Sequence, residues 1–511
     1  MTRMTVYNQL LYALIVFFLC TTIPIESRHR DRDRKKQREP SSLPSQQHHI
    51  IESKAMPINL CSKGRDMKLV CHCSPDNEHE KAQKSECWIF RSDLTLHDLD
   101  WTTFHTQSQL QNLGFSVHGT GNLSFIPTDV IQSLKFLEKL TIEYAQIHEI
   151  FGFAFGNFTR IRNITLSRNQ IRTVNAYAFA NHIELQELSL ASNEIIEIDP
   201  FAFINLPALK RLNLAENQIS TIQEDTFEHL DRLSVLNLSF NLIDYITREI
   251  FKGLGNLWNL SLHHNKLIVI EDDLFIELFS LRDLDLSHNL IERISERAFN
   301  GLGSLGRLNL ENNRLRSLEV ATFSTVPMLT HLNLMRNSLE TITVSTIQPL
   351  MNNLVNHTSM LLMKENKLIC DCRLGWVYDL RNRTKSFQLK YSMEEVECIM
   401  NTKNHRKGVR VSVNVDDSTR KKYSDDDPNY YEDERMDDKN MSNLLLIKAN
   451  DLPCPKQYIQ QFAHPSNQYI GFDLSHWIRS SSPKLQNSLQ LNLILVSFLI
   501  HAFARTFGCI Q

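Results

Sequence analysis

Hydrophobic residues recur with a period of 24 residues over most of the chain. Each unit has leucine or a similar residue at fixed positions, as at Leu185, Leu188 and Leu190, and then an asparagine. The asparagine series is Asn169, Asn193, Asn217, Asn241, Asn265, Asn289, Asn313 and Asn337, and a phenylalanine series is Phe155, Phe179, Phe203, Phe227, Phe251, Phe275, Phe299 and Phe323. A fixed period of this length predicts a solenoid with one turn per unit.

Each unit contains one short predicted strand. Leu188 and Leu190 flank Ser189, and this alternation places both leucines in the core and the serine outside. One unit cannot bury its leucines alone, so we expect parallel stacking of neighbouring units. The asparagine amide is expected to hydrogen-bond the buried turn backbone, and the phenylalanines to fill the opposite wall. Closely spaced strands then line the concave face of a curved stack.

Both ends of the repeat array are irregular. Nine units run from Leu137 to about Leu350, and the first has Ala145 in place of the asparagine. An irregular unit precedes them at about 110–134, and a last unit ends at Asn366 after 29 residues. Such terminal units are expected, because the exposed end of a solenoid needs a polar cap.

The L-x-x-L-x-L-x-x-N-x-L pattern of each unit resembles the leucine-rich-repeat family. The resemblance implies an α/β-type solenoid, a horseshoe with a parallel β-sheet on its concave face and disulfide caps at both ends. Four cysteines precede the repeats and four follow, as in the cysteine-rich flanks of extracellular members. The pairs that the resemblance implies are Cys61 with Cys73, Cys71 with Cys87, Cys370 with Cys398, and Cys372 with Cys454.

Zinc binding is the alternative use of these cysteines, with His72 as a nearby ligand. Structural zinc clusters prefer C-x2-C spacing, whereas an oxidising compartment pairs cysteines. The N-terminus favours the second interpretation, because Arg3, an apolar run at 10–20 and polar sequence from Glu26 predict a secretory signal peptide. Eight Asn-x-Ser/Thr acceptors for N-glycosylation agree with secretion: Asn122, Asn157, Asn163, Asn237, Asn259, Asn356, Asn382 and Asn440.

The C-terminus predicts a glycosylphosphatidylinositol (GPI) anchor. Three serines at 480–482 precede a polar spacer and then an apolar run at 493–504, which is the layout of an attachment signal. The apolar run is shorter than the roughly 20 residues that a membrane-spanning helix needs. We expect attachment at Ser480 on the extracellular side of the plasma membrane, and the alternatives are a secreted product or a short transmembrane segment.

These features divide the chain into seven segments. We expect a signal peptide (1–25), a basic and polar segment (26–56), an N-terminal cysteine-rich cap (57–105), the repeats (106–366), a C-terminal cysteine-rich cap (367–456), a stalk (457–482) and a removable hydrophobic tail (483–511). An acidic loop at 416–438 contains tyrosines beside acids, which resemble sulfation sites, although a plain solvated loop is the alternative. The basic stretch at 28–38 is interpreted as a solvated tail or a proteoglycan contact.

Composition and motifs narrow the functional classes. The net charge of -3 argues against general nucleic-acid binding, and the chain has no nucleophile motif, phosphate loop or H-E-x-x-H motif. We therefore expect no catalysis, cofactor or bound metal. His264 and His288 occupy the same position in consecutive repeats, with His263 beside the first. Metal binding, pH sensing and a simple alignment of surface histidines are the three interpretations.

The concave strand face is the expected site for protein partners. Residues between the leucines are small and polar, and the C-terminal half is chemically more diverse. The predicted partner-binding residues are Asp283, Asp285, Arg307, Asn309, Glu311, His331 and Asn333. Glycans on Asn163, Asn237 and Asn259, which lie on the predicted strands, would hinder access to the middle of this face.

Secretion, flanked repeats and a lipid-type tail together resemble connectin- and chaoptin-type insect cell-adhesion proteins. That resemblance implies cell-cell adhesion and recognition through proteins at the cell surface, including a second copy on an opposing cell. A ligand-binding co-receptor and a secreted matrix or carrier subunit are the alternatives.

Overall fold

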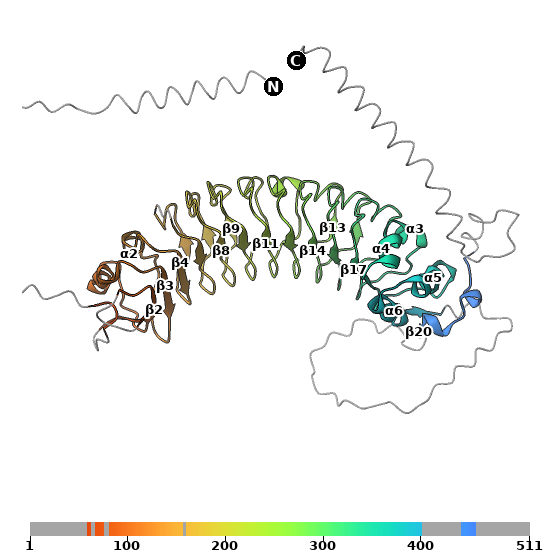
Figure 1. The fold of residues 1–511 in the computed structure, drawn as a ribbon, viewed down its shortest axis with the longest axis horizontal. Coiled ribbons are helices and arrows are strands. Elements are labelled where there is room, and N and C mark those ends of the chain that lie inside the picture. The colour runs from red at the N-terminus through yellow and green to blue at the C-terminus, as the bar shows by residue number, and fades with distance from the viewer. Residues whose placement is uncertain (1–58, 63–66, 76–80, 157–159, 401–440, 456–511) are drawn as a thin grey trace, which may run out of the picture. The chain divides into compact units, whose positions relative to one another are not determined.

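One sheet of thirteen strands lines the inner wall of the solenoid (Figure 1). This computed structural model describes residues 59–62, 67–75, 81–156, 160–400 and 441–455, all within the unit Pro57–Gln511. The strands are, in spatial order, β1 (Leu69–Ser74), β2 (Lys84–Ile89), β3 (Asn112–Val117), β4 (Lys139–Glu143), β6 (Asn163–Thr165), β8 (Glu187–Ser189), β10 (Arg211–Asn213), β11 (Val235–Asn237), β12 (Asn259–Ser261), β14 (Asp283–Asp285), β16 (Arg307–Asn309), β17 (His331–Asn333) and β18 (Met360–Leu362).

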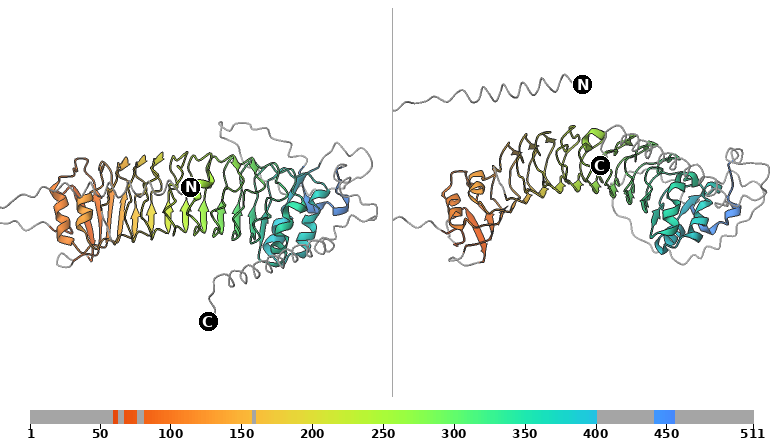
Figure 2. Two further views of the ribbon diagram at one scale, coloured as in Figure 1. Left: turned by 90° about the horizontal axis from the view of Figure 1, so that it is seen from above. Right: turned by 45° about the horizontal axis from the view of Figure 1, so that its top comes forward.

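The strands pair in parallel with a register of one unit per step, after an antiparallel hairpin of β1 and β2. Leu188 therefore lies beside Leu212, and both side chains are buried, whereas Ser189 between the leucines of its strand is half-buried. The last step is longer, since Leu332 pairs with Leu361. Figure 2 shows the strands as parallel rungs along one wall. The predicted parallel sheet and its inward leucines are confirmed.

The outer, convex wall is built on the phenylalanine series. All eight rings have 2% or less of their surface exposed, and neighbours stack with centroids 5.3 Å apart at Phe155 and Phe179 and 6.5 Å apart at Phe275 and Phe299. The returning segments carry short elements: β5 (Glu149–Ile150), β7 (Thr173–Val174), β9 (Glu197–Ile198), β13 (Val269–Ile270), β15 (Arg293–Ile294) and the 3-10 helix η2 (Arg248–Phe251). The rest of each returning segment consists largely of turns, so one repeat needs only 24 residues.

Apart from η2, the helices within the described ranges lie toward the ends of the array. They are η1 (Leu99–Gln107), α2 (Thr128–Ser133), α3 (Val344–Ile347), η3 (Gln348–Leu350), α4 (Met351–Asn356), η4 (Cys372–Leu374), α5 (Trp376–Arg383), α6 (Phe387–Glu394), η7 (Leu444–Leu446) and η8 (Ala449–Asp451). A small hairpin joins β19 (Glu397–Ile399) to β20 (Met441–Asn443). Helices α3, η3 and α4 take up the additional residues of the long last unit.

The asparagine series connects each repeat to the one before it. The amide of Asn265 donates to the carbonyl of Leu238 at 2.9 Å and to that of Leu262 at 3.0 Å. Its Oδ1 accepts from the backbone N–H of Ile243 at 3.0 Å. Asn366 of the long last unit makes the same three bonds. The predicted role of the amide is therefore confirmed.

Disulfides close both ends of the array. The bonds join Cys61 to Cys73, Cys71 to Cys87, Cys370 to Cys398, and Cys372 to Cys454, which are the pairs that the family resemblance implies. At the C-terminal end the ring of Trp376 is buried, and its Nε1 donates to the carbonyl of Ile342 at 2.8 Å. The cap thereby covers leucines that the last repeat would otherwise expose.

Several predicted features lie outside the described residues. These are the signal peptide, the basic segment, the acidic loop, the stalk and hydrophobic tail, the acceptors Asn157 and Asn440, and Ser480. They stay predictions.

We expect Asn265→Ala to lower the free energy of unfolding by about 3 kcal/mol, because it leaves two buried carbonyls and one N–H without their partner. Chemical denaturation of the purified protein measures the change. Asn256→Ala is the control, since its exposed amide donates one bond, to Asp231. Equal effects of the two substitutions would contradict a special role for the buried series.

Candidate partner-binding surface

The central column of the concave face consists largely of asparagine and aspartate. In Asn213, Asn237, Asp285, Asn309 and Asn333 the side-chain oxygen accepts from the backbone N–H two residues later, at 2.9 to 3.2 Å. That N–H lies just beyond the strand, where the turn begins. These residues therefore stabilise the ends of their strands.

The C-terminal half of this face is hollowed. An open depression of about 390 Å³ runs from β12 to β18. Its floor and walls include Asn259, Ser261, His263, Asp283, Asp285, Arg307, Asn309, His331, Asn333, Met360 and Leu362. We call it the C-terminal hollow. The sheet therefore brings together six of the seven predicted partner-binding residues, and Glu311 lies beyond its lining.

Charge in the C-terminal hollow is only partly balanced. Nη2 of Arg307 donates to Oδ2 of Asp283 at 2.6 Å, and Nε of Arg307 contacts the other carboxylate oxygen. Asp283 is buried, so this pair is partly shielded from water. Asp285 instead accepts from the backbone N–H and the hydroxyl of Ser287. Within the described part of the chain Asp285 has no ion pair, and its negative charge is available to a cation.

His331 lies beside the Asp283–Arg307 pair. Its Nδ1 is 2.9 Å from the hydroxyl of Thr330. Burial lowers the pKa of His331 below its usual range, and the positive charge of Arg307 lowers it further, while Asp283 acts in the opposite direction. The neutral imidazole is therefore favoured in the folded protein.

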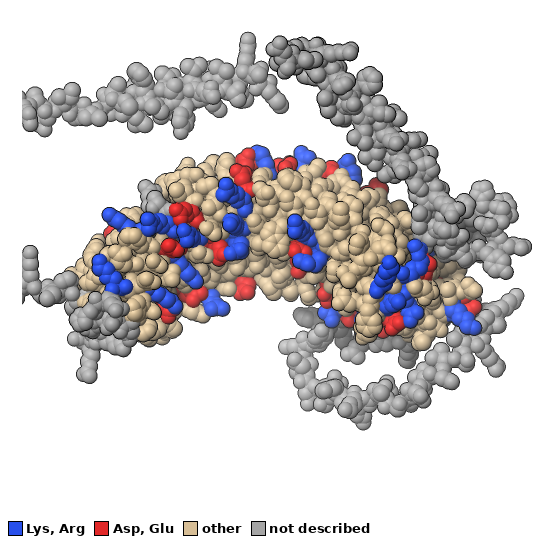
Figure 3. All heavy atoms as spheres, viewed as in Figure 1, with Lys and Arg blue, Asp and Glu red and all other residues tan. Residues whose placement is uncertain are grey.

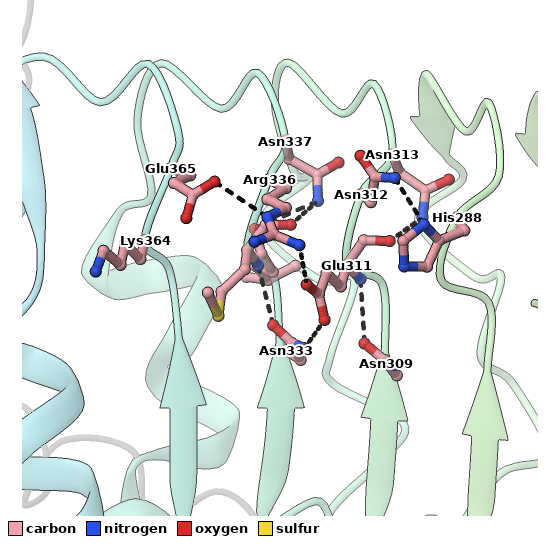
Figure 4. Close-up of polar contacts among 12 residues, drawn as sticks. His288, Asn309, Glu311, Asn312, Asn313, Asn333, Arg336, Asn337, Lys364 and Glu365 are labelled. Carbon is pink, nitrogen blue, oxygen red and sulfur yellow. Dashed lines mark hydrogen bonds and ion pairs between the residues drawn. The ribbon is translucent and has the colours of Figure 1, made fainter. Parts of the chain in front are cut away.

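A polar network runs along the edge of the sheet beside the hollow (Figure 4). Glu311 accepts from the amide of Asn333 at 3.0 Å and from Arg336 at 3.3 Å. Arg336 also donates to Glu365 at 3.0 Å. Glu311 thus lies outside the hollow and supports Asn333, which lines the hollow. Its column in the sequence had instead predicted a direct contact between Glu311 and a partner. Elsewhere on the visible face, acidic and basic side chains are intermixed (Figure 3).

The aligned histidines form part of a ring stack at the same edge. The rings of His264 and His288 are stacked with centroids 4.1 Å apart, and Phe240 stacks on His264 from the other side at 4.2 Å. Nδ1 of His263 is 2.8 Å from Nδ1 of His264. Burial, His288 and His263 lower the pKa of His264 against the opposing effect of Asp285. Within the described residues, no group of three His, Cys, Asp or Glu side chains is arranged to hold a metal ion.

Glycan acceptors on the strands have different surroundings. The amide of Asn163 donates to Glu187 at 2.7 Å. Oδ1 of Asn237 accepts from the backbone and hydroxyl of Ser239. Asn259 lies in the wall of the C-terminal hollow itself. If these acceptors carry glycans, the sequence predicts that partners use the region beyond Asp283, a lateral edge or the convex side. The hollow extends one repeat further toward the glycan acceptors than Asp283.

Sequence reasoning missed two apolar residues of the hollow. Met360 and Leu362 lie on β18, in the columns that hold polar residues in earlier repeats. Both are half-buried and face the concave side. Reading the columns across the 29-residue step would have found them, because Met360 pairs with His331 and Leu362 with Asn333.

Comparison with known proteins agrees with this architecture. A family model described as leucine rich repeat matches residues 183–243, 231–291, 255–315 and 303–352. With the parallel sheet, the buried asparagine series and the disulfide-bonded flanks, these matches show that the chain has a leucine-rich-repeat fold with a cysteine-rich flank at each end. It is 59% identical to connectin of Drosophila melanogaster over 341 residues, which are 67% of this chain and 50% of connectin. The chain thus spans about half the length of that relative.

Solved structures that match this chain include chains of two protein complexes. A chain of the octameric complex of Latrophilin 3, Unc5D and FLRT2 has a TM-score of 0.46 at 22% identity, covering 55% of this chain and 82% of that one. A chain of the glycosylated Drosophila Toll–Spatzle complex has a TM-score of 0.45 at 20% identity, covering 61% and 48%. Among the described residues, none of the helices has the length and apolar character required to cross a membrane.

We expect the free energy of unfolding to fall on acidification from about pH 7 to pH 5. The folded-state pKa values of His264 and His331 lie below the unfolded value, so their contribution is present above the unfolded pKa and is lost as the pH falls through the folded one. Thermal unfolding across this range measures the effect. His264→Asn should reduce the pH dependence, because it removes one of these two imidazoles. Identical profiles for wild type and His264→Asn would refute the assignment.

Proposed function

We propose that this chain is a cell-surface leucine-rich-repeat protein that mediates cell-cell adhesion and recognition by binding protein partners through the C-terminal hollow. The observation that carries the proposal is that the Asp285 carboxylate, without an ion pair among the described residues, lies in the same hollow as half-buried Met360 and Leu362, three strands along the sheet. A partner that carries a basic side chain and, further along the same face, an apolar one complements this arrangement, since burial supplies affinity and charge supplies specificity.

The extracellular setting is supported by independent observations. Eight cysteines form four disulfides, and such bonds persist in oxidising environments. The similarity to connectin agrees with the adhesion function that the sequence resemblance implies. On this basis we propose that the partner is a second copy on an opposing cell, and that a GPI anchor at Ser480 attaches the protein to the plasma membrane.

Transfected cells test adhesion and anchoring together. Expressing cells labelled with one dye should cluster with expressing cells labelled with another and exclude cells that lack the protein. Phosphatidylinositol-specific phospholipase should release the protein and abolish the clusters. Binding to non-expressing cells would favour a co-receptor, and accumulation in the medium without lipase would favour a secreted subunit. Either outcome would contradict homophilic, GPI-anchored adhesion.

Asp285→Ser should weaken clustering about tenfold. Serine removes the charge and occupies the same column at Ser189 and Ser261, so the strand is preserved. Asparagine is avoided because, followed by Leu286 and Ser287, it would create an N-glycosylation acceptor. Quantitative aggregation at matched surface expression measures the effect. Asn213→Asp is the control, because it adds a carboxylate in the same column of the N-terminal half. Clustering that survives Asp285→Ser, or is lost with Asn213→Asp, would exclude the C-terminal hollow as the adhesive site.

A further inference from the structure

The convex wall of the first regular repeats carries exposed aromatic side chains. Phe153, Tyr177 and Phe201 occupy one column, with 50%, 42% and 52% of their surface exposed. Their rings stack along the solenoid, with centroids 5.6 Å apart between Phe153 and Tyr177 and 6.3 Å apart between Tyr177 and Phe201. We call these three residues the outer aromatic ladder. Phe151, 65% exposed, lies two residues before its first member.

The backbone at this column is unfavourable for aromatic residues. Phe153 and Tyr177 have φ angles of 60° and 61°, in the left-handed region that glycine, asparagine and aspartate tolerate best. Later repeats have Asp225 and Asp273 in the same column, with φ angles of 63° and 59°. Aspartate meets the same backbone requirement in later repeats, so the turn itself does not need an aromatic residue, and about half of each ring stays exposed.

The two sides of the ladder differ in chemistry. Four residues before Phe153 and Phe201 lie Glu149 and Glu197, which form no ion pair within the described residues. Four residues after Tyr177 and Phe201 lie Asn181 and Asn205, whose amides are joined by a hydrogen bond of 2.8 Å. The ladder thus has Glu149 and Glu197, with Thr173 between them, on one side and the paired amides on the other.

We propose that the outer aromatic ladder pairs with the same ladder of a second copy, back to back, about a two-fold axis parallel to the solenoid. This axis places the residue four positions before the ladder opposite the residue four positions after it. Glu197 of each copy then faces the amide of Asn205 of the other, and carboxylates do not meet carboxylates. The interface is isologous, as in most homodimers.

The convex shape of the wall limits the area of this contact, and the two-fold axis sets the relative direction of the two chains. Two convex walls touch over only a few repeats, and the ladder occupies three before Asp225 replaces it. The four aromatic side chains expose about 400 Å², roughly half of what one partner contributes to an interface of standard size. The pairing is therefore weak and needs copies held close together. Both chains run in the same direction, so this contact joins neighbours on one surface and leaves both concave faces open.

Two differently tagged full-length copies, expressed in the same cells and extracted in mild detergent, test the pairing. Each tag should capture the other copy. The double variant Phe153→Asn with Tyr177→Asn should reduce capture at least fivefold, while the melting temperature stays equal or rises, because asparagine suits the left-handed backbone. Unchanged capture would overturn the proposal. A glycan on Asn157 in place of a second copy is one cause that would give this result.

Three controls separate the possible causes. Tyr245→Ser removes a side chain that is 61% exposed and lies outside the ladder, and should leave capture unchanged. The ladder variant is also compared with its parent in an Asp285→Ser background, in which pairing through the C-terminal hollow is weakened. It should reduce capture there as well, which distinguishes the two surfaces. Phe201→Arg should also reduce capture, because it places a charge in the ladder. Unlike Phe153 and Tyr177, Phe201 does not have a left-handed backbone conformation. Lost capture with a lower melting temperature in the ladder variant would mean that the rings support the fold, and the proposal would fail.

Discussion

The hydrogen bonds of the buried asparagine amide fix how each repeat sits on the one before it. Because Asn265 reaches both its own turn and that of the preceding repeat, adjacent turns cannot slide past one another without leaving buried carbonyls unsatisfied. Over the regular repeats, the resulting register places each residue beside its counterpart 24 positions away. The Asp283–Arg307 pair, the stack of His264 on His288 and the buried phenylalanine series all follow from this alignment.

The periodicity of the sequence was sufficient to predict most of the scaffold. Regular spacing identified the inward leucines, the amide series and the stacked phenylalanines, because each depends on a single residue type at a fixed position. The binding surface was harder to predict, since a depression depends on several columns and on the step between repeats. Met360 and Leu362 were missed where the step lengthens to 29 residues. The sequence also could not reveal that Asn309 and Asn333 hydrogen-bond their own strand ends.

The two walls of the solenoid divide the chemistry between them. The concave face carries small polar side chains whose oxygens are mostly engaged by backbone, so Asp285, Met360 and Leu362 differ from their neighbours in what they offer a partner. The convex wall is thin and held by buried rings, and its first repeats carry aromatics where aspartate would suit the backbone better. A stack held from inside by amides and rings tolerates such variation outside, so the two surfaces are free to differ without disturbing one another.

The hydrogen bonds accepted by the side-chain oxygens of the central concave column affect how this surface can change during evolution. Asn213, Asn309 and Asn333 hold the same strand-end bond as Asn237, and each is followed by leucine and then by a residue other than serine or threonine. Replacing Ala215, Glu311 or Met335 with serine or threonine would create a glycan acceptor on the strand before it. Since the oxygen already serves the backbone, the amide nitrogen could bear a sugar without disturbing the strand. One amino-acid replacement could therefore add a glycan to a strand of the sheet or remove one from it.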